Sequence, residues 1–170
     1  MGTELKEDYG MDKIKQFLQW AEAQGWQVER GGPSEIELPK DIRERYPKIS
    51  SEWVEFLAQV KSCVTPDEKA WFLCLDGTAD SAFKWNEMEK MSLVEGDDDY
   101  NEPIIAFWDK HLPIALSVRD DYAYYALKVN DDFGTVVSSF EPYFEEPSPV
   151  APSLEQFLEA IMSGKIDFGD

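Results

Sequence analysis

The stretch that decides the fold is residues 112–139, which read LPIALSVRDDYAYYALKVNDDFGTVVSS. Apolar and small or polar residues alternate along its first third, which is typical of a β-strand. The alternating apolar residues are Leu112, Ile114, Leu116 and Val118. Two groups of turn-forming residues, 119–121 and 130–134, separate this strand from two more, over 122–129 and 135–139. Because such short connections leave no room for crossover helices, the stretch predicts an antiparallel meander.

Outward from the meander toward the N-terminus, the sequence predicts a strand over residues 104–108, preceded by an acidic loop over 95–102. A continuous apolar run over 70–75 predicts a buried strand, and residues 83–93 predict a short helix or an irregular cover for the sheet. Earlier still, helical periodicity predicts three helices. The first has the apolar face Ile14–Phe17–Leu18–Ala21, and the third has the apolar face Trp53–Phe56–Leu57–Val60. Between them is a short helix that Tyr46-Pro47 ends.

The C-terminal part reads as an acidic, proline-rich loop followed by a helix. The loop covers residues 141–152, and Ser153 is placed to cap the helix that Gly164 ends. Helices at both ends of a meander favour one α+β domain. We therefore expect a flexible N-terminus over residues 1–10 and a single domain over 11–170, with a meander sheet packed against N-terminal helices and a C-terminal helix.

Charge is the strongest compositional feature. The chain has 35 acidic residues against 16 Lys and Arg, a net charge of −19 with His neutral. Such a surface repels nucleic acid and anionic membranes and accelerates encounters with basic proteins. An acidic protein without a charge-selected partner fits the same composition. We expect no nucleic-acid or membrane partner, and composition indicates no oligomeric state.

The two cysteines and the chain start point to the cytoplasm. Cys63 and Cys74 have neither the number nor the spacing of a disulfide framework or a metal site. No apolar run approaches the length of a membrane span, and the first residues lack a signal-peptide pattern. We therefore expect a cytoplasmic protein without cofactor or metal.

Acidic and aromatic residues gather in three segments that we consider as a partner-binding surface. The residues are Asp97, Asp98, Asp99, Glu102 and Trp108 in the first segment, Asp120, Asp121, Tyr122 and Tyr124 in the second, and Glu141, Glu145 and Glu146 in the third. Tyr beside carboxylates suits an interface. Solvated loops, and for the tyrosines a strand covered by a helix, are the alternatives. The first segment fails the calcium-loop template, which needs Gly at 102 and Glu at 108.

Enzymatic function is not expected. The single histidine, His111, has no nucleophile motif to accompany it, and a structural role at the end of a strand explains it. With so many acids, a hydrolase that uses paired carboxylates stays open as an alternative. That alternative requires a deep pocket with converging carboxyl groups.

Several segments, in order, resemble the SUKH superfamily, which includes fungal cell-wall-assembly regulators and bacterial immunity proteins. Leu38-Pro39-Lys40-Asp41 with residues 53–57 resembles its entry motif, and residues 107–115 resemble the strand that opens its sheet. Residues 120–125 resemble its tyrosine strand, and residues 153–158 its closing helix.

The resemblance implies a binding domain without catalytic activity. In bacteria such domains commonly neutralise a toxin, often a nuclease. A nuclease holds phosphates in a basic cleft, and a net charge of −19 complements such a cleft. The sequence-based hypothesis is therefore an immunity protein that blocks a basic toxin, with a housekeeping adaptor for a cytosolic complex as the alternative.

Overall fold

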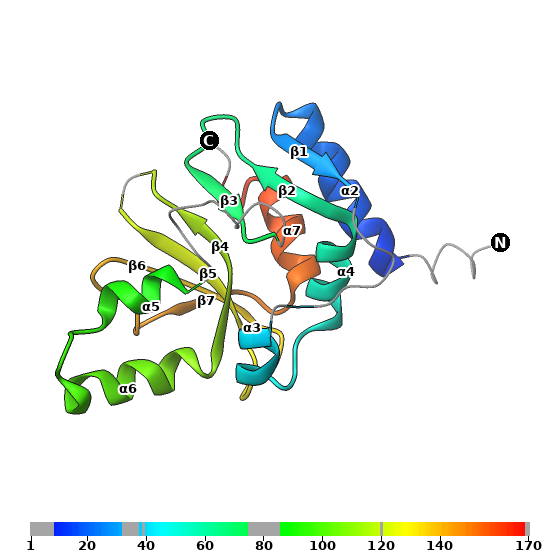
Figure 1. The fold of residues 1–170 in the computed structure, drawn as a ribbon. Helices are drawn as coiled ribbons and strands as arrows, with labels where there is room; N and C mark the ends of the chain where they lie inside the picture. The colour runs from blue at the N-terminus through cyan, green and yellow to red at the C-terminus, as the bar shows by residue number, and fades with distance from the viewer. Residues whose placement is uncertain (1–8, 32–37, 39, 75–85, 120, 169–170) are drawn as a thin grey trace.

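The structure is a computed structural model, and it describes residues 9–31, 38, 40–74, 86–119 and 121–168. Within these residues a sheet contains seven strands, each antiparallel to its neighbours and arranged in chain order (Figure 1). The strands are β1 (Gln27–Arg30), β2 (Val60–Val64), β3 (Ala70–Phe72), β4 (His111–Ser117), β5 (Ala123–Lys128), β6 (Val136–Phe140) and β7 (Ser148–Ala151). The predicted single α+β domain with an antiparallel meander is confirmed.

Helices lie at both ends of the chain, between β1 and β2, and between β3 and β4. They are α2 (Tyr9–Ala23), α3 (Lys40–Arg45), α4 (Ser51–Gln59), α5 (Glu87–Ser92), α6 (Asp98–Trp108) and α7 (Leu154–Met162). Gly25 follows α2 with φ +91°, a left-handed conformation that favours glycine. The Ser153 side chain accepts a hydrogen bond from the Gln156 N–H at 3.2 Å, which confirms the predicted cap of α7.

The sheet is covered on both faces. Successive side chains of a strand point to opposite faces, and here both sets are buried: Tyr124 packs in one hydrophobic cluster and Leu127 in the other. Helices α2, α4 and α7 cover the face of the larger cluster, whereas α5 and α6 cover the face of the smaller one (Figure 1). Burial on both faces explains why almost all of β4 is apolar.

The predicted strand over 104–108 is wrong, because these residues form the second half of α6. Ile104 and Trp108 are buried four residues apart, while Ile105 between them is exposed, which is the helical period. The predicted acidic loop over 95–102 is also wrong in part, since Asp98 to Glu102 are helical. A short apolar run fits a strand and a helix equally well, and here the helix start at Asp97 decides.

Three strands were not predicted as strands. β1 and β7 are largely exposed at the two edges of the sheet, where the apolar alternation is weak. β2 begins at Val60, which the sequence assigned to the apolar face of the preceding helix. At the N-terminus, α2 begins at Tyr9, two residues before the predicted start of the domain. Residues 1–8 lie outside the described part of the chain.

Candidate functional site

The acidic residues at the start of α6 are part of its N-terminus. The Asp97 side chain caps the helix by accepting a hydrogen bond from the Tyr100 N–H at 3.1 Å, and Asp98 and Asp99 occupy the first turn. Carboxylates at this end interact favourably with the helix dipole. Local sequence therefore both starts the helix and places three carboxylates at one end of it.

A side chain of α6 also fixes the connection from α5. Asn101 accepts from the Val94 N–H at 2.8 Å through its Oδ1 and donates to the Val94 carbonyl at 2.7 Å through its Nδ2. Val94 thus donates and accepts with one partner, as a residue does in a hydrogen-bonded pair of antiparallel strands. These two hydrogen bonds close the loop between the helices. The two helices therefore form a defined hairpin.

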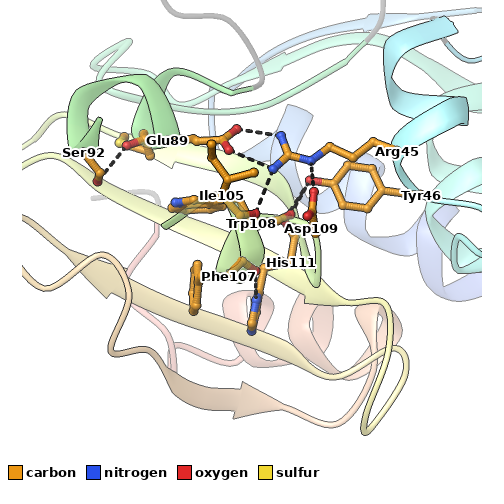
Figure 2. Close-up of polar contacts among 10 residues, drawn as sticks. Arg45, Tyr46, Glu89, Ser92, Ile105, Phe107, Trp108, Asp109 and His111 are labelled. Carbon is orange, nitrogen blue, oxygen red and sulfur yellow. Dashed lines mark hydrogen bonds and ion pairs between the residues drawn. The ribbon is translucent and has the colours of Figure 1, made fainter. Parts of the chain in front are cut away.

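Arg45 of α3 anchors this hairpin to the rest of the domain (Figure 2). Its two terminal nitrogens donate to both carboxylate oxygens of Glu89 in α5, at 2.6 and 2.8 Å. Its Nε donates to Asp109 at 2.8 Å, and Nη2 also donates to the Ile105 carbonyl at 3.2 Å. Glu89 is buried, and hydrogen bonding to it raises the pKa of Arg45 above its ordinary value. One guanidinium thus ties α5 and α6 to α3 in a fixed geometry.

Two neighbouring side chains secure the end of α6. The Tyr46 hydroxyl donates to the carbonyls of Trp108 and His111, at 2.6 and 3.1 Å, and burial raises its pKa. His111 stacks on Phe107 with ring centroids 4.0 Å apart, and its Nδ1 lies 2.7 Å from the Phe107 carbonyl (Figure 2). Burial lowers the pKa of His111. The predicted structural role of this histidine at a strand end agrees with these contacts.

The outer side of the hairpin combines exposed carboxylates, none of them in an ion pair with another described residue, with exposed apolar side chains. Between residues 91 and 108 the chain has five acidic residues and no Lys, Arg or His. Four large apolar side chains here keep between 39% and 53% of their surface exposed. We call this region the α5–α6 surface; it comprises Met91, Val94, Tyr100, Ile105, Glu95, Asp97, Asp98, Asp99 and Glu102.

A shallow groove of about 450 Å³ runs along the exposed side of α6. Asp98, Asn101, Glu102, Ile105, Ala106 and Asp109 line it. Their spacing of three and four residues places them on one side of the helix. Ile105 therefore lies in the groove with carboxylates toward both ends of the helix.

The other two acidic segments are adjacent to each other where β5 begins and β6 ends. The Glu141 N–H donates to the Tyr122 carbonyl at 2.9 Å, so the predicted second and third segments are neighbours. Phe140 and Tyr143 are about half exposed and pack edge to face at 5.7 Å. Asp121, Glu141 and Glu146 are exposed and Glu145 is half-buried, whereas Asp120 lies outside the described residues.

Two residues predicted for the partner-binding surface are core residues instead. Trp108 is 1% exposed and Tyr124 is 0% exposed. Their rings pack together at 4.8 Å, and the Tyr124 hydroxyl donates to the Phe144 carbonyl. The prediction for Tyr124 assumed that one sheet face is solvent-exposed. It was wrong because α6 and the β6–β7 connection cover that face.

The same contacts relate the acidic segments to each other. Tyr124 packs against Trp108 on one side and Phe144 on the other, with ring centroids 4.8 and 6.1 Å apart. Both α6 and the 141–146 segment therefore cover the same face of the sheet. The sequence predicted the acids of both segments. It missed Arg45 and the apolar residues Met91, Val94, Tyr100 and Ile105, and helical periodicity in 98–108 was the signal for Ile105.

Nowhere in the described residues do three His, Cys, Asp or Glu side chains group in a way that could hold a metal ion. None of the helices in this part of the chain has the length and apolar character needed to cross a membrane.

Comparisons with known proteins do not add an identity. No family model, no curated protein and no solved structure matches the chain.

Proposed function

We propose that this protein is a non-enzymatic binding domain that captures a basic protein on its α5–α6 surface. One observation carries the proposal: on a firmly anchored helical hairpin, exposed apolar side chains stand among exposed carboxylates that form no ion pair with a described residue. The carboxylates attract a basic partner from a distance, and the apolar side chains supply area to bury once the partner has docked.

The anchoring supports this function because a surface that is already ordered loses little entropy on binding. Arg45 holds α5 and α6 through Glu89 and Asp109, and Asn101 closes the loop between them. Arg45 also neutralises Asp109. Of the carboxylates that line the groove, those available to a partner are therefore Asp98 and Glu102.

The identity of the partner class rests on the resemblance to the SUKH superfamily. We propose that the partner is a basic toxin, for which a nuclease is the leading candidate, and that the protein acts as an immunity protein by covering the toxin's basic cleft. A housekeeping adaptor role requires the same surface but a partner from the cell's own complexes.

The first test is binding to the product of the neighbouring gene, purified as a catalytically inactive variant. We expect association to slow about tenfold between low and high salt, since exposed charges are screened over a Debye length of about 8 Å at physiological ionic strength. The double variant Asp98→Lys/Glu102→Lys is expected to weaken binding by at least about tenfold.

A matched control separates the surface from the net charge. Glu44→Lys/Glu55→Lys makes the same charge change at exposed positions of α3 and α4, and we expect it to change affinity less than about threefold. Equal losses from both variants would reject the α5–α6 surface as the site. Failure of the neighbouring gene product to bind would reject the immunity proposal.

A further inference from the structure

A second candidate binding site lies at the other end of the domain from α6. A hollow of about 560 Å³ opens where α2 and α7 end, on the side of the larger hydrophobic cluster. Figure 1 shows the C-terminal ends of these two helices at the top of the molecule and α6 at the bottom. Trp20, Gln24, Trp26, Ser163, Asp167 and Phe168 are among the residues that line the hollow. Its volume is within the range of small-ligand sites.

The backbone makes this hollow electronegative. The C-terminal end of a helix carries a partial negative charge. Most last-turn carbonyls of α2 and α7 accept backbone N–H groups from the residues that follow, which reduces this charge without removing it. Two helices end here, and neither α2 nor α7 has a basic residue in its last turn to offset that charge. Asp167 adds a full negative charge at the same place. The local field therefore favours a cation.

The basic side chains close to the hollow either form an ion pair with another residue or lie outside the hollow. Arg119 donates to both carboxylate oxygens of Asp67, at 2.8 and 2.9 Å, and to the Phe168 carbonyl at 2.9 Å. Lys165 lines a neighbouring hollow beside β7. None of the described residues that line the α2–α7 hollow is Lys, Arg or His. The negative field is thus not neutralised from within the hollow.

Aromatic rings supply the second element of a cation site. Trp20 is partly buried and meets Trp26 edge to face at 5.7 Å, while Trp26 stacks on Phe168 at 5.6 Å. Contacts within this group hold the Trp20 indole at the edge of the hollow. A flat cation is attracted to an indole face, and a guanidinium also directs several N–H donors toward carbonyl and carboxylate oxygens.

We propose that the hollow between the ends of α2 and α7 binds a guanidinium group, such as the side chain of an arginine on a peptide or protein. The guanidinium lies against Trp20 and donates to Asp167. This site is independent of the α5–α6 surface and stands whether or not that surface binds a protein.

The test uses the full chain and two small probes of the same shape. N-acetyl-arginine amide is titrated while the indole N–H signals of the tryptophans are followed by NMR, with the Trp20 signal assigned from a Trp20→Phe variant. N-acetyl-citrulline amide replaces the guanidinium by a neutral urea group. We expect the arginine probe to shift the Trp20 signal with a dissociation constant in the millimolar range, and the citrulline probe to bind at least about tenfold more weakly.

Two variants of similar chemistry complete the test. Asp167→Asn, at an exposed residue, is expected to weaken binding of the arginine probe about fivefold. Asp131→Asn, at an exposed residue of the turn between β5 and β6, removes the same charge outside the hollow and is expected to leave binding of the arginine probe unchanged. Equal binding of the two probes, equal effects of the two variants, or no shift of the Trp20 signal would each overturn the proposal.

Discussion

The two faces of the sheet are covered in different ways. On the α2–α4–α7 side, stacked and edge-to-face rings fill a large cluster, with Phe72 in contact with Phe56, Phe157 and Phe168. On the α5–α6 side the cluster is smaller, and a polar network fastens the helices from outside, with Arg45 at its centre. The first layer is held mainly by apolar burial and the second by burial together with hydrogen bonds and ion pairs.

This difference indicates how one domain combines stability with a binding surface. Apolar burial is roughly proportional to area, so the larger cluster contributes most of the stability. A thin hairpin on the opposite face has little apolar area of its own, and it leaves Met91, Val94, Tyr100 and Ile105 exposed. Polar anchors then keep these residues in place.

The largest effect is expected from removal of the central anchor. Arg45→Met leaves the buried carboxylate of Glu89 unpaired, and we expect it to lower the free energy of unfolding by about 3 kcal/mol in urea denaturation. Amide hydrogen exchange in α5 and α6 should accelerate more than in α2 and α7. The double variant Arg45→Met/Glu89→Met is expected to recover most of the loss, because it removes both charges.

Lys40→Met serves as a control for this experiment, since Lys40 is exposed on the same helix, and we expect a change within about 0.5 kcal/mol. A uniform acceleration of exchange over both layers would contradict the separate anchoring of the hairpin.

A smaller effect is expected from the buried hydroxyl that links strand β5 to the β6–β7 connection. Tyr124→Phe leaves the Phe144 carbonyl without its donor, and we expect a loss of about 1–2 kcal/mol. Tyr143→Phe removes a hydroxyl from a half-exposed ring and should change stability by less than about 0.5 kcal/mol. Equal values for the two variants in thermal or urea unfolding would show that the Tyr124 hydroxyl contributes nothing specific.

The helix cap should matter about as much as an ordinary surface hydrogen bond. Asp97→Ala removes the acceptor for the Tyr100 N–H, and we expect it to cost about 1 kcal/mol in the free energy of unfolding. Glu102→Gln on the exposed side of α6 is expected to stay within about 0.5 kcal/mol while it weakens partner binding. A destabilisation by Glu102→Gln as large as that by Asp97→Ala would mean that the surface acids serve folding.

The smallest effect is expected from His111 and depends on pH. Burial lowers its pKa from 6.5, and the nearby Lys110 and Lys128 act in the same direction. The folded state therefore takes up a proton less readily than the unfolded state, so this contribution to stability is full above pH 6.5 and declines as the pH falls below it. His111→Asn should reduce the loss of stability between pH 7 and pH 5.5 relative to the unaltered protein. An unchanged pH profile in urea unfolding would refute this assignment.

Much of the fold was predictable from local patterns. The alternation at 112–118 and the two turns fixed β4 to β6 within about two residues, and the Ser153 cap fixed α7. The failures have one cause, which is that short segments adopt the structure their neighbours impose. Residues 104–108 form a helix because Asp97 starts one, and β2 forms because β1 and β3 pair with it.

Less of the candidate surface was predictable. The sequence showed that the acids at 97–102 gather together, because neighbours in the chain remain neighbours in space. It did not show that Trp108 and Tyr124 point inward, since burial of a strand residue depends on whether a helix covers that face. It gave no sign of Arg45, because that guanidinium meets Glu89 44 positions further along the chain.

The sequence alone determined the net charge, the α+β class and the order of the sheet's central strands, because these follow from composition, period and short connections. Tertiary structure alone decided that both sheet faces are covered and that a remote arginine fastens α5 and α6. It also decided that the ends of α2 and α7 meet around Trp20. These outcomes depend on contacts between distant segments, and packing selects such contacts only when the whole chain has folded.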